Sequence, residues 1–431
     1  MKKTIVLLMI CYISNTYSQE RFTSLNAVLE YASKNSLTLQ GNSIRYNQAK
    51  KRKLAAIVGI LDPLGGGNLS AINNSKLPVT LFPDVSNPGV YNETKFGKKY
   101  NTSFEQNISV KLLNLEGWEN LRLAKINLDL TNSNSQITIK ELQENIANNY
   151  FNIVSLQIQK KSALQNQTVA DTLYQIALNK YNLSLVKQQD VNDSKANFLN
   201  TKENVNQIEY LIQQNYLSLK NLCDIPEEEE IVIENNNPDF VQIFNPNVLE
   251  NTLNLDNAIL KEKYALRNFE QTKNYTLPNI SFIFNQSSQR YSDPFKVFGG
   301  TWYKSSYIGL NFSFSLPINA GNMAKKFNAK YEYELTQKAT KQARIKSTLN
   351  VRNLENEYNK NKSQYQSNNE IYILRKDTYE KNKRLYISGQ QSLDQTLNSF
   401  NAMVNAEYNL ISSKINIHLI EARIDINNKI R

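Results

Sequence analysis

Apolar and aromatic residues recur every seven positions within residues 323–386, and this repeat constrains the fold more than any other feature. The repeating positions are Val351, Tyr358, Tyr365, Tyr372, Tyr379 and Tyr386. No proline interrupts the stretch, and its only end signal is Ile387-Ser388-Gly389. A seven-residue spacing is typical of coiled coils, and the polar residues on the other faces exclude a membrane-spanning helix. About sixty helical residues make a rod roughly 95 Å long, which is too long for the core of a compact domain.

A helix returns after this turn, and the whole pattern also occurs in the first half of the chain. In each half a shorter helix and two strands precede a pair of long helices, which indicates an internal duplication. The first repeat is predicted at 19–225, with a helix at 24–57, a β-hairpin region at 64–113 and long helices at 118–181 and 190–222. The second is predicted at 247–431, with a helix at 247–275, a β-hairpin at 278–317 and long helices at 322–386 and 392–428, after a link at 226–246. The triple glycine at 65–67 is expected in turns or extended chain.

Residues 1–18 have the composition of a secretory signal peptide. Lys2 and Lys3 precede an apolar stretch and a small-residue cleavage site before Gln19. Cleavage removes two lysines and lowers the net charge from +11 to +9. We expect this excess to be spread along solvated helix faces, so no nucleic-acid partner is predicted. Cys223 is then the only cysteine, which excludes an internal disulfide.

Residues 104–112 and 308–316 alternate between apolar and polar side chains, as strands with two different faces do. In the second stretch the apolar positions are Ile308, Leu310, Phe312, Phe314 and Leu316. Exported strands of about ten residues with one apolar face are typical of transmembrane barrels. Aromatic residues nearby are expected at the membrane–water interface, and these are Phe298, Trp302, Tyr303 and Tyr307. Two surface hairpins packed on the helices are the alternative, but no nearby segment resembles a core that would cover the apolar face.

Two strands from each half give four per chain, and four strands cannot close a barrel. Open edges are not tolerated in lipid, so several copies have to combine their strands. Three copies give twelve strands and the size of a pore, whereas two copies give a narrow barrel of eight. Polar positions such as Asn107 and Asn311 would line the wet lumen. The long helices of all copies can form a hollow cylinder continuous with this barrel. A solid fibrous bundle is the alternative, and it leaves the alternating strands unexplained.

This duplicated design resembles the TolC-like outer membrane factor family of outer membrane efflux proteins, over essentially all of the mature chain. The most specific segments are the two helix tips, Tyr-Asn-Leu-Ser-Leu-Val-Lys-Gln-Gln-Asp-Val at 181–191 and Tyr-Ile-Ser-Gly-Gln-Gln-Ser-Leu at 386–393. Leu-Pro-Asn-Ile at 277–280 and the strand exit at 316–321 support them. The resemblance implies a mainly α fold with a small β part. Two repeats of long antiparallel coiled-coil helices and four transmembrane strands per protomer would form a trimeric twelve-stranded β-barrel continuous with an α-helical barrel.

The resemblance also implies a function, that of a passive exit duct in the outer membrane of a Gram-negative cell, with its helices in the periplasm. Its partners would be two further copies, outer-membrane lipid, a periplasmic adaptor (membrane fusion protein) and an inner-membrane pump of the RND or ABC type. The pump decides the substrate, so drug efflux and protein secretion both stay open. The adaptor would dock at the helix tips, which are closed at rest. The tip positions are Leu183, Ser184, Leu185, Ser388, Gly389 and Gln390.

In the family, an acidic residue on the first tip bonds a tyrosine on the second and holds the gate shut. Asp190 and Tyr386 match these positions, and such a charge-assisted bond contributes about 1.5–3 kcal/mol. A solvent-facing Asp190 is the alternative. The chain departs from the family pattern at the constriction and at an arginine of the gate: these positions hold Gln395, Asn398 and Gln391, with Asp394 one step round the helix. The closed gate is therefore expected to depend on neutral hydrogen bonds rather than on a cation-binding ring.

An enzyme is not predicted. His418 is the only histidine, and its heptad spacing from Ile411 favours a packed position. The sequence has no nucleophile motif, phosphate-binding loop or Cys/His metal spacing, so no catalytic residue, metal or cofactor is expected. The main alternative from another class is an exported coiled-coil scaffold or adhesin without transport activity.

Overall fold

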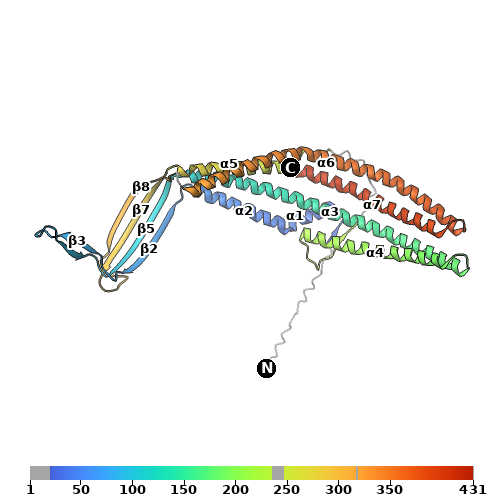
Figure 1. Ribbon diagram of the computed structural model, residues 1–431, viewed down its shortest axis with the longest axis horizontal. Coiled ribbons are helices and arrows are strands. Elements are labelled where there is room, and N and C mark those ends of the chain that lie inside the picture. Colours follow the sequence, from blue (N-terminus) through green and yellow to red (C-terminus); the bar gives the residue numbers. More distant parts are fainter. Residues whose placement is uncertain (1–19, 235–246, 317–318, 431) are drawn as a thin grey trace, which may run out of the picture. The chain divides into compact units, whose positions relative to one another are not determined.

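The structure is a computed structural model that describes residues 20–234, 247–316 and 319–430 (Figure 1). The predicted signal peptide, most of the link between the repeats, and Pro317 of the strand exit lie outside the described residues. The chain divides into two compact units. Unit 1 contains residues 1–44, 133–256 and 342–431, and unit 2 contains residues 45–132 and 257–341. Each unit contains parts of both repeats, so the sequence repeat is not the structural unit.

Unit 2 is built on one antiparallel sheet of four strands. The strands are β2 (Leu64–Asn73), β5 (Tyr100–Leu113), β7 (Asn279–Ser292) and β8 (Tyr303–Ser313), in that order (Figure 1). The central pairing of β5 with β7 joins the first repeat to the second. The connection from β2 to β5 forms a separate hairpin of β3 (Val79–Pro83) and β4 (Tyr91–Lys95), which was not predicted. The glycines at 65–67 lie inside β2, where they pair with β5 instead of forming a turn.

The register gives the sheet one apolar and one polar face. Ile108, Phe284 and Ile308 form one row across β5, β7 and β8, and the next row is Val110, Phe282 and Leu310. Ile308 is 71% exposed and Phe312 is 65% exposed, so this apolar face is not covered within the chain. The opposite face carries the row Asn107, Asn285 and Tyr307, and it also carries Tyr303 opposite Gln289.

The register shows which sheet face carries two of the aromatic residues expected at a membrane–water interface. Because successive side chains point to opposite faces, Tyr303 and Tyr307 lie on the polar face and not on the apolar one. Phe298 and Trp302 lie in the connection between β7 and β8, where Phe298 is 77% exposed and Trp302 is half-buried. That these four aromatic residues mark a membrane–water interface stays a prediction.

The long helices have the same layout in both repeats. α3 (Leu115–Asn182) and α6 (Ala320–Ile387) are the outgoing helices, and α4 (Gln188–Cys223) and α7 (Leu393–Lys429) return. α3 and α6 both have 68 residues. The start and end of α6 and the start of α7 each lie 205 positions after their counterparts in the first repeat. Asn114 and Asn319 correspond as well, and the side-chain oxygen of each accepts a backbone N–H in the first turn of its helix. No helix in the described ranges is long and apolar enough to cross a bilayer.

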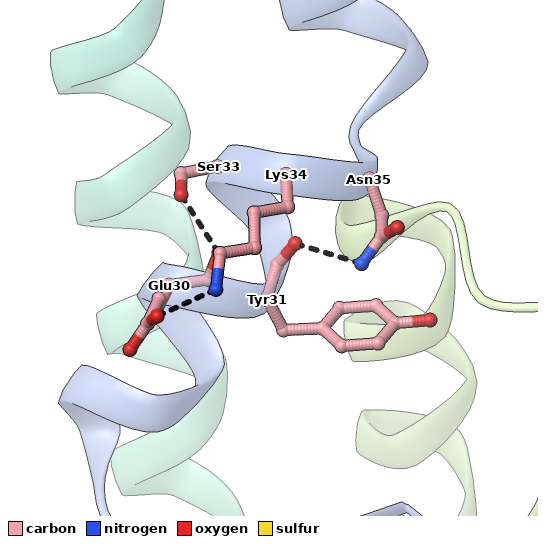
Figure 2. A network of polar contacts seen from close by, with 5 residues as sticks. All are labelled: Glu30, Tyr31, Ser33, Lys34 and Asn35. Atoms are coloured by element: carbon pink, nitrogen blue, oxygen red, sulfur yellow. Dashed lines mark hydrogen bonds and ion pairs between the residues drawn. The ribbon is translucent and has the colours of Figure 1, made fainter.

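The predicted helix at 24–57 is two helices in the structure, α1 (Leu25–Asn35) and α2 (Leu37–Val58). Figure 2 shows side chains that bind within the last turns of α1: Lys34 pairs with Glu30 at 2.6 Å, and Asn35 donates to the Tyr31 carbonyl at 3.1 Å. The hydrogen bond and positive charge of Lys34 lower the pKa of Glu30. Asp224, at the end of α4, then accepts the Leu37 N–H at 2.8 Å and starts α2. The break is therefore made by a residue 187 positions away.

α5 (Leu253–Lys273) starts six positions later than predicted, and the short 3-10 helix η1 (Asn274–Thr276) follows it. Residues 247–252, predicted as helix, are not helical, because the end of α7 takes their backbone hydrogen bonds. Asn428 accepts the Leu249 N–H at 3.0 Å, and Asn427 donates to the Leu249 carbonyl at 3.0 Å.

The main core of unit 1 lies where the first residues of the described chain meet the link between the repeats. β1 (Glu20–Phe22) pairs in parallel with β6 (Ile231–Ile233). Beneath this pair, Phe22, Val28, Ile153, Leu219 and Cys223 are buried together. Burial raises the pKa of the Cys223 thiol to about 12, so Cys223 is a small packed side chain here.

Candidate functional site: the helix tips

The two helix tips of unit 1 have the same backbone geometry. α3 ends in a turn in which Ser184 has φ 60°, and α6 ends in a turn in which Gly389 has φ 81°. In the first turn the N–H of Ser184 donates to Tyr181 and that of Leu185 donates to Lys180. In the second, Gly389 donates to Tyr386 and Gln390 to Leu385. Both are Schellman turns, which need a left-handed residue one position past the helix.

The two return helices start with complementary halves of a capping box. At the first tip, the Asp190 carboxylate accepts the N–H of Lys187 at 3.1 Å. At the second tip, Ser392 Oγ accepts the N–H of Gln395 at 3.4 Å. Asp190 and Gln395 correspond in the duplication, so Asp190 has a local role in starting α4.

Lys180 joins the first tip to the second. Its Nζ lies 4.2 Å from the centre of the Tyr386 ring and also donates a hydrogen bond to the Tyr386 carbonyl oxygen. A cation over an aromatic face is an attractive contact, worth most where it is shielded from water. The sequence did not single out Lys180, because a lysine in the last turn of a helix is common and complements the helix dipole.

Tyr386 is 2% exposed, and within the described part of the chain its hydroxyl has no hydrogen-bond partner. The expected bond to Asp190 is therefore absent from this structure, because Asp190 instead caps α4. The two groups still interact: burial raises the pKa of Tyr386, and the negative charge of Asp190 raises it further. Tyr379, one heptad earlier, is also buried without a partner for its hydroxyl among the described residues, and burial raises its pKa too.

The buried tyrosines belong to a tip cluster, a name used here for Ala170, Leu173, Ala177, Tyr379, Tyr386, Leu393, Leu397, Phe400 and Met403. α3 contributes two alanines and Leu173, and the larger aromatic side chains come from α6 and α7. Tyr379 and Phe400 contact each other with their ring centres 5.3 Å apart. The small alanines of α3 let the second helix pair approach closely, and this approach places Lys180 against Tyr386.

The remaining predicted site residues lie at the surface of the tips. Leu183 is 69% exposed and Leu185 is 68% exposed, while Ser184, Ser388, Gly389 and Gln390 are also exposed. Gln391 is half-buried, and Gln395 is exposed. Asp394 accepts a hydrogen bond from Asn398 at 3.2 Å, so these two neighbours satisfy each other on the surface of α7. The structure brings Lys180, Tyr386 and Asp190 together.

His418 lies away from the tips on α7. Its Nδ1 is 3.3 Å from a Glu421 carboxylate oxygen, and its ring stacks on Phe151 with centres 6.5 Å apart. Among the described residues no group of three or more His, Cys, Asp and Glu side chains is arranged to hold a metal ion.

This arrangement is the fold of solved outer-membrane channels. The Campylobacter jejuni CmeC outer membrane channel has a TM-score of 0.74 at 18% identity, over 94% of this chain and 85% of that one. Vibrio cholerae VceC has a TM-score of 0.73 at 14% identity, over 94% and 95%. The outer-membrane channel OprN has a TM-score of 0.75 at 13% identity, over 96% and 94%.

A family model matches part of the sequence. Residues 68–223 match the outer membrane efflux protein family, which confirms the resemblance drawn from the helix tips. These residues contain β5, α3, the first tip and α4. Comparison with curated protein sequences finds no significant match.

Proposed function

We propose that three copies of this chain form an outer-membrane exit duct of an efflux or secretion system in a Gram-negative cell, with the helices in the periplasm. The observation that carries the proposal is the sheet of unit 2. Its apolar face is exposed along β8, where Ile308, Leu310 and Phe312 are each more than half exposed, while its other face is polar. A face of this kind is expected in contact with lipid on one side and with a wet lumen on the other.

The sheet edges support an oligomer. Within the described residues, β2 and β8 each pair on one side only. In a bilayer an unpaired edge is costly, because each unsatisfied backbone group costs several kcal/mol. Pairing β2 of one copy with β8 of the next removes both edges. Two copies would give eight strands, whose interior is just filled by side chains, whereas three give twelve and leave a lumen.

The tips are proposed as the gate of this duct. Lys180 connects the first helix pair to the second through the ring and carbonyl of Tyr386. Separating the pairs breaks this contact and exposes the tip cluster. Asp190, Gln391, Asp394, Gln395 and Asn398 remain candidate gate residues in the assembled trimer, where neighbouring copies add contacts. A periplasmic adaptor is proposed to dock on the exposed Leu183 and Leu185 and their counterparts Ser388 and Gln390, and to supply the energy that separates the pairs.

Single-channel recording in planar bilayers tests the proposal against the coiled-coil scaffold or adhesin. The purified protein is expected to insert, to migrate as a trimer after cross-linking, and to conduct in small, mostly closed steps. A scaffold produces no channel steps at any protein concentration.

The gate is tested separately with Lys180→Met, which removes the charge and keeps the length of the side chain. We expect a higher open fraction, because the two helix pairs lose a contact that spans both tips. Lys195→Met is the matched control, since Lys195 is an exposed lysine on α4. Equal open fractions for the two variants would remove Lys180 from the gate while leaving the channel function intact.

A further inference from the structure

The positive charge of the chain is concentrated in one unit. Unit 2 holds 24 of the 50 Lys and Arg residues but only 12 of the 39 Asp and Glu residues. Unit 1 holds the other 26 basic and 27 acidic residues and is almost neutral. Much of this excess lies along helices, as expected, but on the helix segments of unit 2 rather than evenly over the chain. Unit 2 also contains the four-stranded sheet, so the charge lies in the same unit as the proposed membrane-spanning strands.

Within unit 2, many of the cations lie on helix segments close to the ends of the strands. Lys50, Lys51, Arg52 and Lys53 form an unbroken run on α2, which ends at Val58, six positions before β2 begins at Leu64. Lys325 and Lys326 lie in the first two turns of α6, which begins seven positions after β8 ends. At 1.5 Å per residue, the run on α2 lies about 7–12 Å along the helix axis from the end of that helix. Figure 1 shows α2 and α6 reaching the same end of the sheet.

The run on α2 has no ion-pair partner among the residues that the structure describes. Lys50, Lys51 and Arg52 are exposed, and Lys53 is half-buried. None of the four forms an ion pair with the described residues, whereas other cations of unit 2 do, such as Lys111 with Asp62 at 2.7 Å. Four adjacent like charges repel one another, and an external anion relieves that repulsion.

Three cations of this run, Lys50, Lys51 and Lys53, line a hollow of about 390 Å³ on α2, which combines charge with apolar surface. It is lined by Asn47, Lys50, Lys51, Lys53, Leu54 and Ile57. Leu54 is 55% exposed and Ile57 is 46% exposed, and both lie between the cations and the start of β2. The order along the helix is thus cation first, then aliphatic side chains, then the strand. This order suits a ligand with an anionic group at one end and an apolar part directed toward the membrane.

We propose that the hollow on α2 binds an anionic phospholipid. The phosphate lies on the three lysines that line the hollow, Lys50, Lys51 and Lys53, and the glycerol and acyl portion lies against Leu54 and Ile57. The inference rests on the proposed function, because it places the strands in the bilayer and α2 at the level of the headgroups. A cation near an anionic membrane surface favours binding about fivefold, and lysine stems can cover apolar surface while their charges reach the phosphate.

The test uses the full chain in mixed nanodiscs of phosphatidylcholine and phosphatidylglycerol. The lipid that stays with the purified protein is then quantified by mass spectrometry. The test variant is Lys50→Gln/Lys51→Gln/Arg52→Gln/Lys53→Gln. The matched control replaces four exposed cations of unit 1, as Lys195→Gln/Lys202→Gln/Arg375→Gln/Arg384→Gln.

The wild-type chain and the control are expected to retain phosphatidylglycerol in preference to phosphatidylcholine, and the test variant to lose roughly tenfold or more of that preference. Raising the salt concentration should weaken the preference of the wild-type chain in the same direction. Equal preference in wild type and test variant overturns the proposal. So does a test variant that no longer cross-links as a trimer in either lipid, because a second copy would then occupy the hollow.

Channel recordings on the same preparations separate this proposal from the proposed function. A wild-type chain that conducts but shows no preference for phosphatidylglycerol refutes the lipid site alone. A wild-type chain that retains the anionic lipid but never conducts refutes the channel alone.

Discussion

Tyr181 and Tyr386 occupy the same position in the two repeats, yet Tyr181 is 40% exposed and Tyr386 is 2% exposed. Both close a Schellman turn with the same hydrogen bonds, so the backbone does not distinguish them. The difference lies in which helix face is buried. On α3 the buried face carries Ala170 and Ala177, whose counterparts on α6 are the exposed Arg375 and the half-buried Asn382. The two repeats therefore share the turn and the length of the outgoing helix, but α3 and α6 bury different faces.

At the tips, the geometry of the turn does not determine which side chains are buried. A conserved turn is satisfied by its own backbone, and a side chain is buried only if the neighbouring helices cover it. α3 contributes alanines to the tip cluster, while α6 contributes tyrosines. The two tips are therefore suited to different roles, the first tip carrying Leu183 and Leu185 at the surface and the second placing Tyr386 inside.

The largest expected effect comes from truncating the two tyrosines. Tyr386→Ala removes a buried ring and leaves a cavity, so we expect a loss of about 3–5 kcal/mol in the free energy of unfolding. Tyr181→Ala should change it by less than about 1 kcal/mol, because the ring is partly solvated. Thermal unfolding of the detergent-purified protein, followed by far-ultraviolet circular dichroism, measures both. Equal losses would mean that burial in a single chain does not describe the assembled tips.

The next largest effect on stability is expected when the left-handed residues of the two turns are exchanged. Gly389→Ser should destabilise the second tip by about 1–2 kcal/mol, because a side chain is disfavoured at positive φ. Ser184→Gly should stabilise the first tip by up to a similar amount, less the entropy of a more flexible unfolded chain. The same melting experiment reads both changes, and shifts of the same sign would contradict the shared turn geometry.

The capping difference predicts a smaller pair of effects. Ser392→Ala removes the side-chain acceptor at the start of α7 and should cost about 1 kcal/mol. Lys187→Ser supplies the missing acceptor at the start of α4, where Asp190 already provides the other half of the capping box, and should add about 0.5 kcal/mol. Hydrogen exchange of the first-turn amides in each return helix is the direct measurement. Unchanged exchange in both variants would show that the tips are held by tertiary contacts alone.

The smallest expected change in stability distinguishes two arrangements of Tyr386: the contacts seen in the structure, and a hydrogen bond to Asp190. Tyr386→Phe removes a buried hydroxyl without a partner, so the free energy of unfolding should stay constant or rise by up to about 1 kcal/mol. A loss of about 1.5 kcal/mol or more would instead indicate the charge-assisted bond to Asp190. Asp190→Asn is the companion variant, and it should weaken only the cap of α4.

The pH dependence of this pair follows from the raised pKa of Tyr386. Because the folded phenol holds its proton more tightly than the unfolded one, the unfolded state ionises first. The stabilising contribution of the protonated Tyr386 phenol is therefore complete below the ordinary tyrosine pKa of about 10, and it is lost as the pH rises above that value. The difference in the free energy of unfolding between the wild type and Tyr386→Phe should show this loss in melting curves recorded from pH 8 to 11. A difference that does not change with pH would contradict burial of the hydroxyl.

The sequence alone determined the features that act over short distances along the chain. The heptad of tyrosines predicted α6, and the Ser-Gly turn signal predicted its end, because helix periodicity and positive φ are local properties. The strand alternation predicted two faces. It also assigns Tyr303 and Tyr307 to the face of Asn311 and not to that of Ile308, because alternate residues of a strand lie on the same face.

Only the tertiary structure decided the features that depend on residues far apart in the chain. The break between α1 and α2 depends on Asp224, the late start of α5 depends on Asn427 and Asn428, and the contact of Lys180 with Tyr386 depends on α3 meeting α6. The concentration of charge also became visible only when the contacts grouped segments of both repeats into unit 2. The physical reason is the same in each case. A side chain's partner is set by which distant segment packs against it, and a periodic pattern specifies the face that packs but not the neighbour that covers it.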